Sequence, residues 1–246
     1  MKILYALRDF FFPPVCPGCG EVFRVKYGEQ NELCPICRRK WELQKSNICP
    51  SCAERFSDCR CSPKALENSG TSTLIKLVPY CSKPAVSNNI VLYMKKKRDF
   101  RIFSFVASEL LFELERYISK MGIRREDILI TYCPRKRKSV NEIGFDQARM
   151  IATCLSKISN IRCDSLILRK ISLAKAQKKL DAKKREKSVK NAFALKRSVD
   201  LKGKTVVLVD DLVTTGATMG KCASLLKKGG ASLVVGLCVA YTEKNV

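Results

Sequence analysis

The feature that most constrains the fold is a thirteen-residue run of apolar, acidic and small residues from Val206 to Thr218. Its first four residues are apolar β-formers, and such an unbroken run is typical of a parallel strand buried on both faces. Asp210 and Asp211 follow, and a short loop of Thr, Gly and Ala then opens a helical pattern. The run therefore predicts a strand, a loop and a helix in direct succession.

The predicted loop has the composition of an anion-binding site. Backbone N–H groups at the start of a helix, together with the hydroxyls of Thr214, Thr215 and Thr218, would surround a phosphate. The two acids lie at the carboxyl end of the strand, where open α/β sheets bind ligands. Carboxylates in that position suit ribose hydroxyls, or a Mg²⁺ ion and its waters. The alternative is a chance strand, turn and helix in some other α/β fold.

The whole run resembles the signature of the type I phosphoribosyltransferase family, which binds 5-phosphoribosyl 1-pyrophosphate (PRPP). This resemblance implies that Asp210 and Asp211 hold the ribose hydroxyls and the Mg²⁺ that accompanies PRPP. It also implies that the loop holds the 5-phosphate, through Thr214, Thr215, Gly216, Ala217 and Thr218.

Strand and helix patterns alternate around this run, which predicts an α/β fold with a parallel sheet flanked by helices. Strands are expected at 74–80, 128–134, 165–169, from 205, and at 232–240, and helices at 88–97, 144–159 and 218–228. A further helix is expected from Phe100 to a C-cap at Gly122, because apolar residues recur there at helical spacing.

The chain has fourteen cysteines, and eight of them lie close together in the N-terminal quarter. They form three C-x₂-C pairs and one C-x-C pair: Cys16 and Cys19, Cys34 and Cys37, Cys49 and Cys52, Cys59 and Cys61. Thiolates at this spacing form the knuckles of tetrahedral zinc sites. We therefore predict two structural zinc ions in a Cys-rich double ribbon. A redox dithiol would need a thioredoxin-like context, which is absent.

The pairing of these ligands stays open at this stage. Sequential grouping places the first four cysteines around one zinc and the last four around the other, whereas a crossed grouping would mix the ribbons. A region this short cannot fold on its apolar core alone, so the metals are expected to stabilise it. We expect the ribbon domain to span residues 1–65 and the phosphoribosyltransferase-like domain residues 70–246, joined by a linker at 62–73.

Composition limits the functions that the chain can have. There is no histidine, which excludes Cys–His and Ser–His catalysis and any His-ligated zinc. The formal net charge of +24 favours polyanionic partners such as nucleic acid, although a solvated basic surface explains it equally well. No apolar run is long enough to span a membrane, and the apolar N-terminus, expected to form a helix at 3–12, lacks the features of a signal peptide. A cytoplasmic protein is expected.

A zinc-ribbon front end joined to a PRPP-binding fold resembles the ComF family, whose members are linked to competence for DNA uptake. The resemblance covers nearly the whole chain. It rests on the segments 12–19, 130–135, 144–148, 176–180 and 192–193, on Arg185 and on the signature run. The chain departs from the family pattern at Ile143 and Ser188. Neither position belongs to the acid pair or to the phosphate loop, so the departures call catalysis into question more than PRPP binding.

The family resemblance also implies roles for other residues. The loop through Cys133, Pro134, Arg135 and Lys136 corresponds to the pyrophosphate loop, and the lysines at 95–97 lie in the helix before it. The segment containing Gln177, Lys178 and Arg185 corresponds to the flexible loop that closes over PRPP. The basic, thinly apolar stretch around it fits a mobile loop or, alternatively, a solvated helix face.

Three functions are compatible with these features. The first is a PRPP-binding protein of DNA uptake that contacts single-stranded DNA. The second is a phosphoribosyltransferase acting on a nitrogenous acceptor that the sequence does not identify, with Mg²⁺ stabilising the departing diphosphate. The third is a scaffold that docks proteins of the DNA-uptake machinery. Five ribbon aromatics would either stack on bases or fill the ribbon core: Phe12, Phe23, Tyr27, Trp41 and Phe56.

Overall fold

The structure is a computed structural model of the 246-residue chain. It describes residues 13–23, 32–81, 83–135, 137–170, 193–196 and 199–242, with the side chains of residues 137 and 138 excepted. The helix expected at 3–12, and the residues Lys136, Gln177, Lys178 and Arg185, lie outside the described residues.

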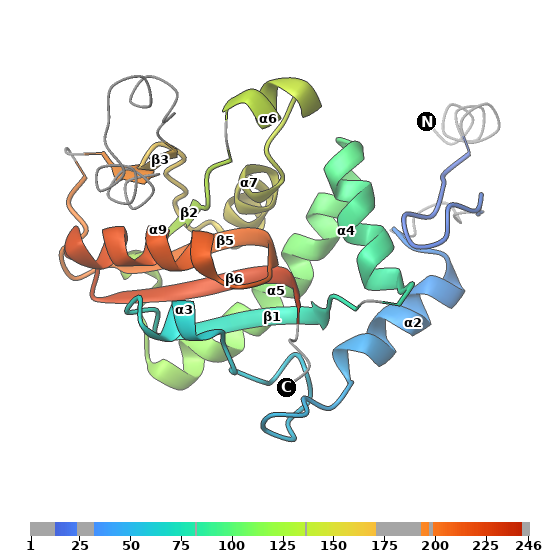
Figure 1. Ribbon diagram of the computed structural model, residues 1–246, viewed down its shortest axis with the longest axis horizontal. Helices are drawn as coiled ribbons and strands as arrows, with labels where there is room; N and C mark the ends of the chain where they lie inside the picture. The colour runs from blue at the N-terminus through green and yellow to red at the C-terminus, as the bar shows by residue number, and fades with distance from the viewer. Residues whose placement is uncertain are drawn as a thin grey trace, which may run out of the picture.

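A four-stranded parallel sheet forms the centre of the molecule, with the strand order β1-β6-β5-β2 (Figure 1). The strands span Thr73–Pro79 (β1), Ile128–Tyr132 (β2), Thr205–Val213 (β5) and Leu233–Tyr241 (β6). They are buried along nearly their whole length because helices cover both faces, as the unbroken apolar runs indicated. The predicted parallel sheet flanked by helices is confirmed.

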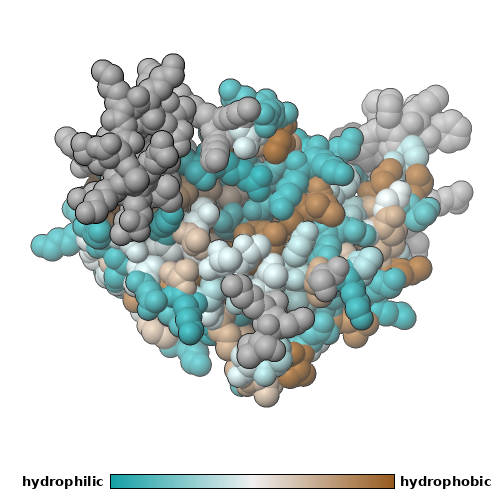
Figure 2. Space-filling view, viewed as in Figure 1, coloured by the Kyte–Doolittle hydropathy of each residue, from teal (hydrophilic) through white to brown (hydrophobic). Residues whose placement is uncertain are grey.

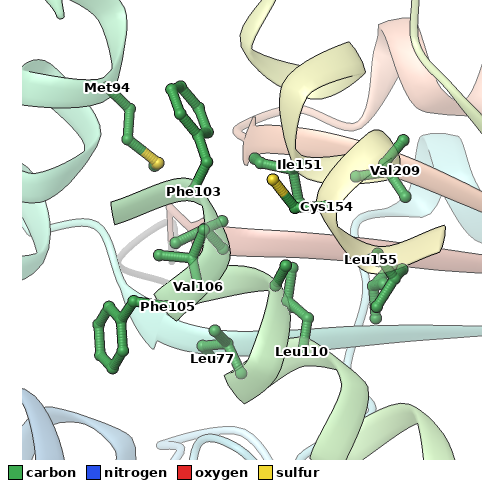
Figure 3. Close-up of a cluster of buried hydrophobic side chains, with 14 of the residues drawn as sticks. Leu77, Met94, Phe103, Phe105, Val106, Leu110, Ile151, Cys154, Leu155 and Val209 are labelled. Carbon is green, nitrogen blue, oxygen red and sulfur yellow. The ribbon is translucent and has the colours of Figure 1, made fainter. Parts of the chain in front are cut away.

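Three helices cover one face of the sheet: α4 (Val86–Lys96), α5 (Phe100–Met121) and α7 (Gln147–Ser159). On the other face lie α9 (Ala217–Lys228) and the short α3 (Lys64–Glu67). Figure 3 shows side chains from α4, α5 and α7 meeting those of β1 and β5 in the first core. Helix α5 begins after the Asp99 cap, and it ends where Gly122 adopts a left-handed conformation with φ 61°, at the C-cap that its sequence predicted.

Two expectations about individual elements need correction. The expected strand at 165–169 is the three-residue β3 (Leu168–Lys170), which pairs antiparallel with β4 (Phe193–Leu195) outside the main sheet. The expected helix at 144–159 is α7, which starts three residues later, after its Asp146 cap, and a separate helix that was not expected, α6 (Arg137–Ile143), precedes it. Gly144 has φ +87°, which breaks the helix between them.

The ribbon region contains a helix that its sequence did not suggest, α2 (Pro35–Lys45), which packs against the first face of the sheet. Trp41 of α2 is fully buried, and its ring centroid lies 5.5 Å from that of Phe105 in α5. Its indole Nε1–H donates to Glu109 at 3.4 Å, and the same carboxylate accepts from Lys45 at 2.5 Å. The ribbon and the sheet domain therefore share one core.

We expect Trp41→Ala to destabilise the protein by about 3–5 kcal/mol, because it empties a fully buried site between α2 and α5. Leu43→Ala, on the same helix but exposed, is the matched control and should change the free energy of unfolding by less than about 0.5 kcal/mol. Denaturant unfolding followed by far-UV circular dichroism, a signal that does not depend on the tryptophan, measures the free energy of unfolding of both variants. Equal stability of the two variants would contradict the packing described.

No helix within the described ranges is both long enough and apolar enough to cross a membrane.

Candidate phosphate site and zinc centres

The two acids at the end of β5 have different surroundings, because successive side chains of a strand point to opposite faces. Asp210 is half-buried and lines the cavities described below. Burial, and then the neighbouring charge of Asp211, raise the pKa of the Asp210 carboxyl well above its usual range. Asp211 is 3% exposed, and its Oδ2 accepts from Nη2 of Arg135 at 2.7 Å. A bound cation beside Asp210 would favour its ionised form.

The loop after β5 forms a small pocket of about 70 Å³, lined by Asp210 and by every residue from Leu212 to Met219. The three threonines of this loop are exposed, whereas Gly216 is buried with φ 72°. Gly216 is the N-cap of α9 and supplies no side-chain cap, and the N–H of Ala217, the first residue of α9, donates to Oγ1 of Thr215 at 3.4 Å. The loop predicted to bind a phosphate thus lines a pocket at the start of a helix, a position that suits an anion.

A larger cavity of about 390 Å³ adjoins the first and shares Asp210 and Thr218 with it. Cys133, Pro134 and Arg135, three of the four predicted pyrophosphate-loop residues, line this cavity. The backbone N–H of Arg135 donates to Oδ2 of Asp146 at 3.1 Å, and Oδ1 of the same carboxylate caps α7 by accepting from the N–H of Arg149 at 3.2 Å. Asp146 thus ties the loop to α7.

Two residues of the larger cavity were not anticipated as site residues, Ser139 on α6 and Lys170 on β3. Lys170 lines the same cavity as Asp210, and its Nζ lies 4.8 Å from the ring centroid of Phe193. The sequence gives no spacing that would single out either residue. Cys133 is 2% exposed, and burial raises the pKa of its thiol well above the ordinary value, so it is not a reactive thiolate.

The basic end of α4 lies next to the pyrophosphate loop. Gln147, at the start of α7, donates from Nε2 to the carbonyl oxygen of Lys95 at 3.4 Å, and the adjacent Asp146 holds Arg135. Three exposed cations follow Lys95, at residues 96–98. Figure 2 shows hydrophilic residues over α6 and over this end of α4. Arg135 and Lys170 therefore line the larger cavity, and further cations lie at the end of α4, which Gln147 connects to α7.

The eight ribbon cysteines come together in two groups of four, Cys16, Cys19, Cys34 and Cys37, and Cys49, Cys52, Cys59 and Cys61. Within each group the sulfurs lie within 4.8 Å of one another, and Sγ of Cys19 and Sγ of Cys34 are 3.9 Å apart. That separation is close to the roughly 3.8 Å that a tetrahedron with Zn–S bonds of about 2.3 Å requires. The grouping is sequential, not crossed.

Backbone N–H groups support these sulfurs, as expected of zinc knuckles. Cys34 N–H donates to Sγ of Cys16 at 3.3 Å, Cys37 N–H to Sγ of Cys34 at 3.5 Å, and Cys61 N–H to Sγ of Cys59 at 3.3 Å. A four-sulfur donor set with hydrogen-bonded sulfurs fits structural zinc. Each group would hold one zinc ion, which would cross-link the segments that carry its ligands.

The ribbon aromatics that the structure describes belong mainly to the core. Trp41 and Phe56 are 0% and 1% exposed, and Phe23 packs partly buried against the first core. Stacking of bases on Trp41 or Phe56 is therefore excluded in this conformation. Phe12 and Tyr27 lie outside the described residues.

Comparison with known proteins agrees with this architecture. The profile of the double zinc ribbon domain matches residues 7–68, and that of the phosphoribosyl transferase domain matches residues 155–245. The DNA utilization protein YhgH of Escherichia coli O6:H1 is 28% identical over 212 residues, which cover 85% of this chain and 90% of that protein.

Two competence proteins are also similar. Competence protein ComFC of Bacillus subtilis is 26% identical over 220 residues, covering 87% of this chain and 85% of that protein. Competence protein F of Haemophilus influenzae is 35% identical over 88 residues, covering 35% of this chain and 38% of that protein. A double zinc ribbon followed by a phosphoribosyl transferase domain, together with relatives named for competence and DNA utilization, agrees with the predicted resemblance to the ComF family.

Proposed function

We propose that this protein binds PRPP with Mg²⁺ at the end of β5. The observation that carries the proposal is the convergence of Asp210, the loop from Thr214 to Thr218 and the loop after β2 on two adjoining cavities. The smaller cavity takes the 5-phosphate at the start of α9. The ribose lies against the acid pair, and the diphosphate lies in the larger cavity beside Arg135 and Lys170.

The ion pair between Arg135 and Asp211 must break when the ligand binds. In the structure the guanidinium of Arg135 neutralises Asp211, which is almost fully buried. A diphosphate in the larger cavity is a stronger partner for that guanidinium than a single carboxylate. Arg135 then turns toward the diphosphate, and Asp211 is released to the ribose hydroxyls or to Mg²⁺ and its waters.

We further propose that the protein contacts single-stranded DNA in DNA uptake or utilisation, with PRPP as a ligand that tunes this contact. The relatives named for competence and DNA utilization support this role, as does the net charge of +24. The exposed cations at residues 96–98 lie beside the pyrophosphate loop, so bound DNA and bound PRPP would share one electrostatic field.

Fluorescence anisotropy of a labelled single strand, at two salt concentrations and with or without Mg²⁺ and PRPP, tests this proposal. We expect binding that weakens steeply with salt, because each phosphate contact releases counterions, and an affinity that changes when PRPP is added. A triple variant of the α4 end, Lys96→Ala with Lys97→Ala and Arg98→Ala, should reduce the salt slope. Exposed Lys120→Ala, at the far end of α5, is the control.

Other outcomes assign the protein differently. Release of pyrophosphate when a nitrogenous base is added would show that PRPP is consumed, and the protein would then be a phosphoribosyltransferase. Weak DNA binding that PRPP does not change, together with salt-insensitive capture of an uptake-machinery protein, would indicate a docking scaffold.

A further inference from the structure

The linker between the two domains lies directly against the predicted phosphate loop. A Cβ atom at Gly216 would be 2.6 Å from Cγ of Pro63 and 3.0 Å from Cγ of Leu66. One turn later, a Cβ atom at Gly220 would be 2.5 Å from the carbonyl oxygen of Ala65. Helix α3 and the residue before it thus form the back wall of the loop and of the first turn of α9.

Helix α3 has only four residues, Lys64–Glu67, too few to be stable in isolation. Its position is therefore determined by its packing and by its two ends. Leu66 is fully buried against the loop, and Ser69 accepts, through its carbonyl oxygen, a hydrogen bond of 3.3 Å from Oγ of Ser224 in α9. On the C-terminal side the chain enters β1 at Thr73.

On the N-terminal side the anchor is the second cysteine group. Its last ligand, Cys61, precedes Pro63 by two residues. The carbonyl oxygen of Cys61 accepts from Nζ of Lys76, a fully buried lysine of β1. The ammonium of Lys76 also lies 5.3 Å from the ring centroid of Phe56 and 4.6 Å from that of Tyr241.

Burying an ammonium is costly unless a negative charge is near. Four thiolates around one Zn²⁺ carry a net charge of roughly −2, so a loaded second centre supplies that charge at the Cys61 end of the linker. Metal binding, the buried lysine and the start of the linker therefore stabilise one another. In register, Lys76 faces Cys238 of β6, which faces Asp210 of β5.

The first cysteine group has no such connection to the loop among the described residues. It packs on α4 instead, where Nδ2 of Asn89 donates to the carbonyl oxygen of Gly18 at 2.7 Å. A Cβ atom at Gly18 would lie 3.2 Å from Cγ1 of Val86. The two centres thus contact different faces of the sheet domain.

We infer that the second zinc centre, through Lys76, Pro63 and Leu66, positions the phosphate loop, so that metal in this centre and not in the first determines how firmly the loop binds an anion. Leu66 and Pro63 are positioning residues, because they act through Gly216 and touch no ligand. The consequence for PRPP rests on the proposed function, whereas the consequence for the loop does not.

Hydrogen–deuterium exchange of the full chain, followed at residues 213–220, tests the inference without any ligand. We expect Cys61→Ser, which removes a ligand of the second centre, to raise exchange there roughly tenfold or more. Cys19→Ser, the matched variant in the first centre, should lose one zinc but leave exchange at 213–220 unchanged. Equal exchange in the two variants would overturn the inference.

Substitutions of Leu66 in the linker test the inference with both zinc ions in place. Leu66→Ala should raise exchange of the loop and weaken binding of inorganic pyrophosphate and of PRPP about tenfold, measured by calorimetry, while zinc content stays at the level of the unmodified protein. Leu66→Met should restore both values, and exposed Lys64→Ala should change neither. If the unmodified protein does not bind PRPP, the proposed function fails, and the exchange results alone decide the inference.

Discussion

Replacing both acids of β5, Asp210→Asn with Asp211→Asn, is expected to abolish PRPP binding while the fold and the zinc content stay intact. Each carboxylate would accept charge-assisted hydrogen bonds from the ligand or hold Mg²⁺, and bonds to charged groups contribute about 1.5–3 kcal/mol each. Loss of both therefore weakens binding by at least about a hundredfold. Isothermal titration calorimetry with Mg²⁺ and PRPP measures the effect.

The two single variants separate the roles of the acids. Asp211→Asn also removes the partner of Arg135, so some loss of stability is expected from it alone. Asp210→Asn leaves that ion pair and reports mainly on the ligand. Asp200→Asn, an exposed carboxylate outside the site, is the control and should bind normally. Retained binding in the double variant would reject the acid pair as the ribose site.

Metal analysis of protein purified under reducing conditions is expected to give about two zinc atoms per chain. The reason is the presence of two separate groups of four sulfurs within 4.8 Å of one another. Structural zinc contributes about 10–16 kcal/mol of apparent binding free energy at neutral pH in small zinc domains, so its removal should unfold the ribbons. Because Trp41 joins the ribbon to α5, the melting temperature of the whole protein should fall.

A thermal melt with and without a strong zinc chelator measures that fall. Cys163→Ser changes a half-buried cysteine outside both groups and should leave the zinc content at two. A purified protein without zinc that melts as cooperatively as the loaded one would reject the ribbon assignment.

Local signals in the sequence predicted much of the fold. The unbroken apolar run at Val206–Val209 marked a central strand because a strand buried on both faces consists mainly of apolar residues. Gly122 marked the end of α5 because a glycine readily adopts the left-handed conformation in which many helices end. The prediction failed at β3, which is three residues long and pairs with a strand more than twenty residues away.

The candidate site was likewise predictable where its residues form a local motif, and unpredictable where they are single residues brought together by the fold. The sequence singled out the acids, the threonines and the loop after β2 as candidate site residues, since these residues form contiguous and chemically distinctive segments. It did not reveal Ser139 or Lys170, because a lone serine or lysine carries no local signal of the cavity it lines. It also counted Trp41 and Phe56 as candidates for stacking, whereas their burial depends on which helix packs over them.

The sequence by itself determined the candidate ligand chemistry of this protein: eight cysteines in closely spaced pairs, and an acid pair followed by a loop whose composition suits a phosphate. The residues of such motifs are neighbours in the chain, so the local backbone geometry keeps their side chains close together. Only the tertiary structure decided that the zinc ligands group sequentially, that Arg135 neutralises Asp211, and that Pro63 and Leu66 press on Gly216. These contacts join residues far apart in the chain, and their formation depends on the packing of whole elements against one another.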